Sequence, residues 1–250
     1  MIYVTGDCHA RFDRFSKCSF PEQKNLTKDD YVIVCGDFGV WDFSLQQKYE
    51  LDELNSRSFT TLFIDGNHEN YDILDNMEEV DWHGGKVHFI RPNIIHLIRG
   101  YIYDIDGYKF FCMGGAASHD ISDGILNPHD SSFIDKLNLL RRNNRNMYRV
   151  NHLSWWEREM PSDKEYERAI HSLTTVHFKV DYILSHCAPT SVLDKLANHV
   201  YEPDKLTDFL QCVCTQTKFK HWFFGHYHKY SEINNFTCNY NKIIPLDNYK

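Results

Sequence analysis

The sequence lacks long apolar runs. None of its apolar stretches approaches the ~20 residues that a membrane-spanning helix requires. The first strand-like run begins at Ile2 and the first polar motif is reached at Asp7, so we expect no secretory leader at this end. We therefore expect no association with a membrane.

Cys-x-x-Cys pairs are also absent, although the chain contains eight cysteines. This absence argues against a structural zinc site. Cys35 and Cys112 lie within apolar runs, which is typical of small core residues. A chain of 250 residues buries a sufficient core without disulfides. We therefore expect reduced thiols and a cytoplasmic location.

An excess of basic residues is absent as well. Lys and Arg number 27 against 35 for Asp and Glu, which gives a net charge of -8. Broad binding to duplex nucleic acid usually requires a basic stripe, so this balance argues against that class. The negative net charge does not exclude an anionic substrate, because bound metal ions supply local positive charge. The chain has no internal repeat or low-complexity tract but has 15 histidines, and we expect a single domain over residues 1–250.

Five short apolar runs, rich in Val, Ile, Tyr and Phe, predict strands that are buried on both faces. They are "IYV" (2–4), "YVIVC" (31–35), "TLFI" (61–64), "YILS" (182–185) and "HWFF" (221–224). Each run ends in a small residue or is followed by polar residues. This pattern is typical of the inner strands of an α/β protein.

Helical periodicity indicates helices between these strands, at 44–58, 162–180 and 204–214. Ser162 and Glu165 form a capping-box signature at the start of the second. Residues 101–115 predict a hairpin with its turn at Asp106-Gly107. Together the elements predict a central mixed sheet flanked by helices, with a second sheet rich in hairpins.

Residues 116–155 differ from this scaffold. They are polar and rich in His and Asp, and then basic in "LLRRNNRNMYR" (139–149). We expect an excursion from the domain that forms a partly helical lid. Its arginines would either clamp substrate phosphates or form a solvated helix face; they are Arg141, Arg142, Arg145 and Arg149.

A potential metal ligand follows each of the five predicted strands. These residues are Asp7 and His9, Asp37, Asn67 and His68, His186, and His226 and His228. Alternate residues of an extended segment point to the same side, so each Asp-x-His or His-x-His pair would face one place. Ligands of α/β folds bind at the carboxyl edge of the strands. If the strands lie side by side, all eight residues converge there.

Their chemistry suits divalent first-row metals, which accept carboxylate, amide and imidazole ligands. Two such ions ~3.5–4 Å apart form the clamp used in phosphoryl chemistry and lower the pKa of a bridging water towards ~7. Asp37 would bridge the ions through its two oxygens. Glycines precede the ligands and allow close approach of the backbone; they are Gly6, Gly36, Gly66 and Gly225.

The order D-x-H, G-D, G-N-H-E, H and G-H-x-H resembles the calcineurin-like metallophosphoesterase superfamily, from residue 7 to residue 228. The resemblance implies a four-layer α/β/β/α sandwich, the metallo-dependent phosphatase fold, with a dinuclear site. It implies one metal ion held by Asp7, His9, Asp37 and His228, and another held by Asp37, Asn67, His186 and His226. His68 would be the uncoordinated histidine that hydrogen-bonds the transition state or protonates the leaving oxygen. His68 and the bridging Asp37 are therefore the candidate catalytic residues.

Departures from the superfamily's motifs narrow the range of substrates that we expect. Its protein Ser/Thr phosphatases carry G-D-x-V-D-R-G and an arginine shortly after G-N-H-E, whereas this chain has "GDFGVWD" and "GNHENYD". Instead "GDFG-W", "GGA-S" (114–118) and "SWWERE" (154–159) look like a group of small bacterial and phage metallophosphoesterases. The usual D-x-H-G is "DCHA" here, and we expect Ala10 to be tolerated because the chemistry lies in Asp7 and His9.

Several residues near the motifs have structural interpretations. Asp65 and Glu69 are expected to be structural or to orient a ligand histidine. His119 is expected to be a surface or structural residue, with a position facing the site as the alternative. Three tryptophans are expected to pack in the core or at its rim, with stacking on a base or sugar as the alternative; they are Trp41, Trp155 and Trp156.

The function that these observations favour is hydrolysis of a phosphodiester or nucleotide by a metal-activated water. One alternative is a phosphomonoesterase or protein Ser/Thr phosphatase, and another is a catalytically silent metal-binding scaffold that recruits a partner. The implied cofactors are two divalent ions, with Mn favoured and Fe, Zn, Ni or Co also compatible. The sequence does not indicate the oligomeric state.

Overall fold

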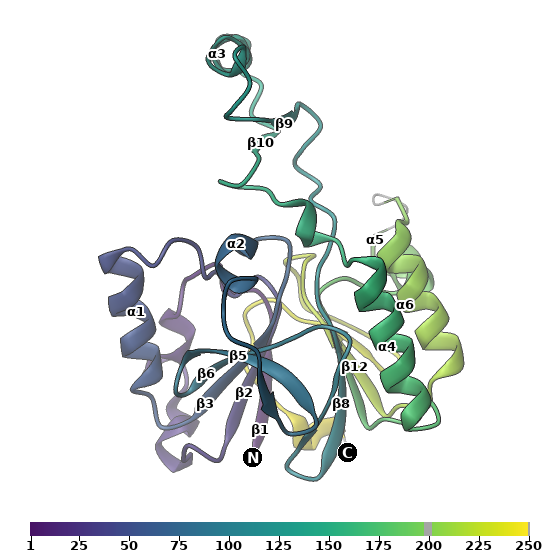
Figure 1. Cartoon of the computed structure of the whole chain (residues 1–250). Coiled ribbons are helices and arrows are strands. Elements are labelled where there is room, and N and C mark those ends of the chain that lie inside the picture. Colours follow the sequence, from purple (N-terminus) through teal and green to yellow (C-terminus); the bar gives the residue numbers. More distant parts are fainter. Residues whose placement is uncertain (198–201, 250) are drawn as a thin grey trace.

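The computed structural model describes residues 1–197 and 202–249 and contains two large β-sheets (Figure 1). The first has seven strands in the order β15-β1-β2-β3-β6-β5-β4. Their bounds are β1 Ile2–Thr5, β2 Tyr31–Cys35, β3 Thr60–Ile64, β4 Val80–Trp82, β5 Gly85–Arg91, β6 Ile94–Leu97 and β15 Ile244–Pro245. The four strands β1, β2, β3 and β6 are parallel, and antiparallel pairing continues the sheet on both sides.

The second sheet has six strands in the order β13-β14-β12-β11-β8-β7. Their bounds are β7 Ile102–Ile105, β8 Tyr108–Met113, β11 Tyr182–Ser185, β12 His221–Phe224, β13 Ser231–Ile233 and β14 Phe236–Cys238. All five strands that the apolar runs predict are confirmed. The second sheet is confirmed, but the expectation that the five strands lie side by side in the central sheet is wrong, because β1, β2 and β3 lie in the first sheet while β11 and β12 lie in the second. Strands close along the chain mostly share a sheet, so β1–β6 build the first sheet and β7, β8 and β11–β14 the second, while β15 returns to pair with β1.

Helices cover the outer face of each sheet (Figure 1). The helices of the described residues are α1 Leu45–Asn55, α2 Tyr71–Leu74, α3 Phe133–Arg142, α4 Asp163–Thr175, α5 Thr190–Ala197 and α6 Lys205–Gln216, of which α3 lies away from both sheets. Helix α1 lies against the first sheet, while α4, α5 and α6 lie against the second. The result is the four-layer α/β/β/α sandwich of the metallo-dependent phosphatase fold, as the resemblance implied.

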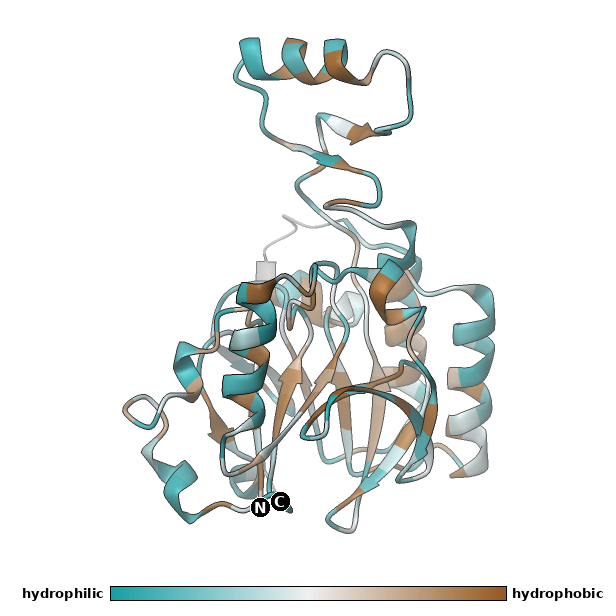
Figure 2. Ribbon diagram, turned by 60° about the vertical axis from the view of Figure 1, so that its left-hand side comes forward, coloured by the Kyte–Doolittle hydropathy of each residue, from teal (hydrophilic) through white to brown (hydrophobic). Residues whose placement is uncertain are grey.

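Alternate residues along one strand serve different cores. In β2, Ile33 and Cys35 face the core between the sheets, and Val32 and Val34 pack under α1 with Leu51. Because both faces of such a strand are buried, its sequence is a continuous apolar run rather than an alternating one. Figure 2 shows the same result, with hydrophobic strands at the centre and hydrophilic helix surfaces outside.

Local signals account for most element boundaries. Ser162 and Glu165 form the predicted capping box of α4, but this helix ends at Thr175 rather than at residue 180. The reason is the left-handed backbone at His177 and Phe178, where φ is 52° at both. The hairpin of β7 and β8 is confirmed, and its turn residues have φ of 54° (Asp106) and 78° (Gly107), as a type I′ turn requires.

Residues 116–155 project from the sandwich, with α3 at the outer end (Figure 1). Two short parallel strands, β9 (Gly124–Leu126) and β10 (Tyr148–Val150), connect this helix to the body. Helix α3 buries none of its residues. Arg141 and Arg142 lie in its last turn, so they belong to a solvated helix face, whereas Arg149 lies at the base of the excursion and pairs with Asp120. A lid function for this segment stays a prediction.

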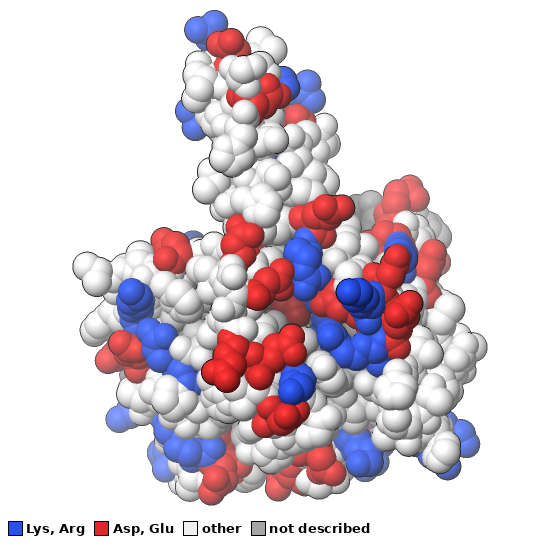
Figure 3. Space-filling model, viewed as in Figure 1, with Lys and Arg blue, Asp and Glu red and all other residues white. Residues whose placement is uncertain are grey.

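The surface carries charges of both signs. Figure 3 shows acidic and basic side chains interspersed over the face that it presents. Across the two described ranges, no helix is long and apolar enough to cross a membrane.

Candidate metal centre

The candidate ligands gather where the two sheets meet. Each follows the carboxyl end of its strand, which is β1, β2 or β3 in the first sheet and β11 or β12 in the second. Hydrogen bonds link the two sets directly, since the main-chain N–H of His226 donates to Asp7 at 3.0 Å and Nδ1 of His186 lies 2.8 Å from the carbonyl oxygen of Cys35. The site is therefore built across the seam between the sheets rather than along one sheet edge.

The first group contains two carboxylates and two imidazoles. One donor atom from each of four residues lies within 4.8 Å of the others; the residues are Asp7, His9, Asp37 and His228. Nε2 of His228 lies 3.1 Å from Oδ2 of Asp7, and Nε2 of His9 lies 3.7 Å from Oδ2 of Asp37. This donor set fits a divalent first-row cation.

The second group surrounds His186. Its Nδ1 faces the Cys35 carbonyl oxygen, which only accepts hydrogen bonds, so Nδ1 carries a hydrogen and Nε2 is the atom that would bind an ion. That Nε2 lies 3.3 Å from Oδ1 of Asp37 and 3.3 Å from Oδ1 of Asn67. Three of the four residues that the resemblance assigns to a second ion therefore contact one another through the atoms that would bind it.

His226 occupies the outer side of this second group. Its ring centroid lies 5.0 Å from that of His186. Its Nε2 lies 2.8 Å from Nε2 of His119, which belongs to the excursion. His119 is thus a neighbour of the candidate centre, which corresponds to the alternative that the sequence left open.

Asp37 lies between the two groups. Its Oδ2 faces His9, while its Oδ1 faces His186 and accepts a hydrogen bond of 2.8 Å from the main-chain N–H of His68. A carboxylate that presents one oxygen to each group has the geometry that a bridging ligand requires.

The backbone at the ligands is strained. Left-handed φ angles of 48°, 48°, 68° and 48° occur at His9, Asp37, His226 and His228. Such angles are uncommon for residues other than glycine and are retained where the surrounding structure enforces them. Here the carbonyl oxygen of Asp37 accepts hydrogen bonds from the N–H groups of Cys8 (2.9 Å) and His9 (2.7 Å).

Two glycines are required by close contacts. A Cβ atom at Gly36, where φ is 91°, would lie 2.1 Å from Nδ1 of His186. A Cβ atom at Gly225 would lie 2.2 Å from Oδ1 of Asp7. Any larger residue at either position would displace a candidate ligand.

The electrostatics favour a cation. Burial opposes ionisation of both Asp37 and His186, but their mutual attraction outweighs it, which lowers the pKa of Asp37 and raises the pKa of His186 to about 10. Burial lowers the pKa of His9 and His226, so their imidazoles are held neutral. Neutral His9 and His226 next to ionised Asp37 are in the protonation states that bind a metal ion, whereas His186 would release a proton on binding one.

Glu69 and Asp65 have structural roles, as predicted. Buried Glu69 accepts hydrogen bonds from the N–H groups of three consecutive residues, Phe38, Gly39 and Val40. Burial raises the pKa of Glu69, and these donors act in the opposite direction. Asp65 binds Arg99, Tyr71 (3.0 Å) and His96 (3.1 Å). These contacts favour the structural alternative, since the hydrogen bonds found among the described residues connect Glu69 and Asp65 to groups other than a candidate ligand histidine.

Ser118 and Glu159 support Asn67, and the sequence did not predict this role. Nδ2 of Asn67 donates to Oγ of Ser118 at 3.3 Å, which turns Oδ1 of Asn67 towards His186. Ser118 in turn donates to both oxygens of Glu159, from N at 2.8 Å and from Oγ at 2.6 Å. These residues lie in the "GGA-S" and "SWWERE" stretches, so those motifs were a signal, but a separation of 41 residues hid the pairing.

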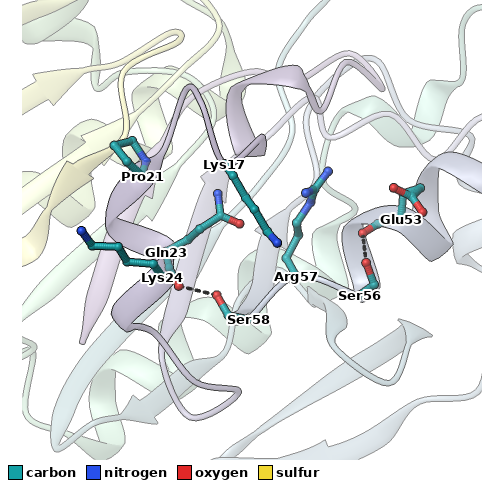
Figure 4. Close-up of a pocket in the computed structure, with 8 residues that line it drawn as sticks. All are labelled: Lys17, Pro21, Gln23, Lys24, Glu53, Ser56, Arg57 and Ser58. Atoms are coloured by element: carbon teal, nitrogen blue, oxygen red, sulfur yellow. Dashed lines mark hydrogen bonds between the residues drawn. The ribbon is translucent and has the colours of Figure 1, made fainter.

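A cavity of about 310 Å³ adjoins the centre at His68. A larger cavity, of about 800 Å³, lies elsewhere and contains none of the candidate ligands (Figure 4). The lining residues of the larger one include Lys17, Lys24, Arg57 and Glu53. The smaller cavity is therefore the one that adjoins the candidate centre, and a substrate bound at the centre would face it.

The sandwich, with the carboxylate–histidine cluster at its seam, has the metallo-dependent phosphatase fold. The family model of the calcineurin-like phosphoesterases matches residues 1–230, and the chain belongs to this family of hydrolases acting on phosphoric esters.

Curated relatives match part of the chain. Lariat debranching enzyme A of Xenopus laevis is 27% identical over 145 residues, which cover 52% of this chain and 24% of the relative. Lariat debranching enzyme of Danio rerio is 27% identical over 143 residues, which cover 49% and 23%. The alignments thus span about a quarter of the relatives' length. Among solved structures, a phosphopantetheinyl hydrolase of Mycobacterium tuberculosis superposes with a TM-score of 0.40 and 14% identity, covering 96% of this chain and 89% of that one.

Proposed function

We propose that this protein hydrolyses a phosphodiester or nucleotide with water as the nucleophile at a dinuclear metal centre. The observation that carries the proposal is the position of Asp37, which presents one carboxylate oxygen to each group of candidate ligands. Membership of the phosphoesterase family supports the reaction class. The name of the curated relatives, lariat debranching enzyme, favours a diester in a nucleic acid over a phosphoprotein.

Two sets of residues would hold the metal ions. One set is Asp7, His9, Asp37 and His228, and the other is Asp37, Asn67, His186 and His226. Mixed oxygen and nitrogen donors fit Mn, our preferred metal, as well as Fe, Zn, Ni or Co. When bound, the ions supply Lewis-acid polarisation of the phosphate and lower the pKa of a water molecule.

His68 would act on the leaving group. Its main-chain N–H donates a hydrogen bond of 2.8 Å to Oδ1 of Asp37, and its ring centroid lies 5.4 Å from that of His9. Burial and nearby Arg149 lower the pKa of His68, although Asp37 acts against them, so a protonated ring would release its proton readily. The imidazole would donate to the leaving oxygen, a contribution of about 10²–10⁴ in rate.

Hydrolysis of bis-p-nitrophenyl phosphate and of p-nitrophenyl phosphate tests the proposal. The protein is stripped of metal and supplied again with Mn²⁺, and His68→Ala and Asp37→Asn are compared with His171→Ala, a control at an exposed histidine of α4. We expect diester turnover that requires Mn²⁺, falls by about 10²–10⁴ in His68→Ala, and is unchanged in the control.

Other outcomes select the alternatives. Preference for the monoester would favour a phosphomonoesterase. Turnover of phosphopeptides would then be compared with turnover of nucleoside monophosphates, to distinguish a protein phosphatase from an enzyme that acts on nucleotides. Undiminished turnover in both site variants would contradict the proposed mechanism. Absence of turnover, with tightly held metal and a stoichiometric bound partner, would favour the scaffold.

A further inference from the structure

The cavity beside His68 is formed by three segments that are distant in sequence. They are the loop between β2 and α1, the loop after β3 that carries His68, and β10 with the chain that follows it at the base of the excursion. The lining residues are Trp41, Asp42, His68, Arg149, Leu153, Ser154 and Trp156. Its volume, about 310 Å³, lies at the lower end of the range of small-molecule sites.

Trp41 presents an open aromatic surface in this cavity. The side chain is 44% exposed, which is unusual for the largest apolar residue type. Its indole N–H nevertheless donates to the carbonyl oxygen of His68 at 3.1 Å, and its own carbonyl oxygen accepts from Asn70. The ring is therefore anchored to the loop that carries His68 without being covered by the core.

Trp156 has a different role. It is 6% exposed, and its indole N–H donates to Asp72 at 2.8 Å, so it packs as the sequence predicted. It forms a wall of the cavity, and Leu153, which is 68% exposed, supplies an apolar edge. The stacking alternative thus applies to Trp41.

Polar groups surround this aromatic surface. Arg149 is fixed by Asp120, with 3.0 Å between Nε and Oδ1, and its charge acts on His68. The Ser154 hydroxyl accepts from the N–H of Val150 at 2.9 Å, which leaves its hydrogen to be donated. Asp42 adds a carboxylate acceptor. A planar heterocycle with donors and acceptors on its edges, attached to a phosphate, matches this combination.

We infer that this cavity binds the nucleobase on the leaving-group side of the scissile bond, with the base stacked on Trp41. The inference rests on the proposed function, because His68 is both the proposed donor to the leaving oxygen and a wall of the cavity. The nucleoside that departs with that oxygen would lie where Trp41 and Leu153 are exposed. Arg149 would attract an adjoining phosphate.

Calorimetric titration of the Mn²⁺-loaded protein tests the inference without requiring turnover. The probes are adenosine 5′-monophosphate and ribose 5-phosphate, which differ only in the base. Base–aromatic stacking predicts that the nucleotide binds about 5- to 150-fold more tightly. Trp41→Ala should abolish this preference, whereas Trp41→Phe should keep most of it.

The second variant separates stacking from positioning. Trp41→Phe also loses the hydrogen bond to His68, so a preference retained there is due to the aromatic face. Tyr49→Ala serves as a control, because Tyr49 is a 63% exposed aromatic residue of α1 outside this cavity, and it should leave both affinities unchanged. Equal binding of the two probes, or a preference that survives Trp41→Ala, would overturn the inference.

Failure of the inference differs from failure of the proposed function. If the protein prefers the nucleotide through Trp41 but hydrolyses no diester, the base site is supported and the proposed reaction is contradicted. If it hydrolyses diesters in a Mn²⁺-dependent manner but binds both probes equally, the reaction is supported and the base site is contradicted.

Discussion

The carboxylate of Glu69 accepts a hydrogen bond of 2.6 Å from the main-chain N–H of Phe38, the residue that follows Asp37. The same carboxylate accepts from Gly39 and Val40. The last residue of the G-N-H-E motif therefore fixes the loop of the G-D motif, and with it the distance between Asp37 and Asn67. This role belongs to the positioning of ligands rather than to the reaction.

Replacement of Glu69 should destabilise the protein and weaken metal binding. Glu69→Ala leaves buried N–H donors without an acceptor, and we expect the free energy of unfolding to fall by about 3 kcal/mol. Glu69→Gln should have a smaller effect because one oxygen remains. Urea unfolding of the metal-stripped protein, followed by Mn²⁺ titration, measures both effects, with exposed Glu78→Ala as the control. Unchanged stability in Glu69→Ala would contradict the role.

Asp37→Asn should weaken binding of both metal ions. Asn keeps the shape of the side chain and one oxygen, but it removes the charge that both groups share. Loss of supporting residues around metal sites typically costs ~10–100-fold in affinity, so we expect at least about 100-fold for a bridging ligand. Metal analysis after dialysis and Mn²⁺ titration provide the readout. Asp81→Asn, at an 85% exposed side chain, is the matched control. Weakening of one ion alone would contradict bridging.

His119→Ala should affect only one side of the centre. Nε2 of His119 lies 2.8 Å from Nε2 of His226, which belongs to the second set, so its loss should reduce affinity for the ion held there by about 10-fold. Binding at the set that includes Asp7 should not change. Stepwise Mn²⁺ titration distinguishes the two events, and His129→Ala, at an exposed histidine of the excursion, is the control. Two unchanged affinities would show that His119 does not support the centre.

Glu159 should make stability depend on pH. Burial raises the pKa of Glu159 to about 7, although hydrogen bonds from Ser118 act against it. In the folded protein this group then binds a proton at pH values where the unfolded chain, with a pKa near 4.5, has released it. Protonation of Glu159 therefore contributes to the free energy of unfolding. This contribution is at most about 3 kcal/mol; it is fully present below pH 4.5 and is lost as pH rises through about 7.

Urea midpoints of the metal-stripped protein between about pH 4.5 and 8 measure this dependence. The informative quantity is the difference in stability between the native protein and the Glu159→Gln variant, whose side chain at this position cannot titrate. We expect the native protein to lose stability relative to the variant as pH rises. A difference that stays constant with pH would show that Glu159 is ionised throughout.

Strands, caps and turns were predictable because their causes are local. A strand such as β2 is covered on both faces, and this produces an uninterrupted apolar run that needs no partner to be identified. The capping box of Ser162 and Glu165 is likewise contained within four residues. The end of α4 was not predictable, since the left-handed backbone at His177 and Phe178 has no strong residue preference behind it.

The sequence by itself determined which residues follow the strands and in what order, because ligand motifs and strand ends are adjacent along the chain. Only the tertiary structure decided that these strands divide between two sheets and that the centre lies at their seam. It also decided the contacts of Ser118 with Glu159, of His119 with His226, and of Trp41 with His68. Such contacts join segments far apart in sequence, and no local pattern encodes a pairing that depends on how two sheets and an excursion pack together.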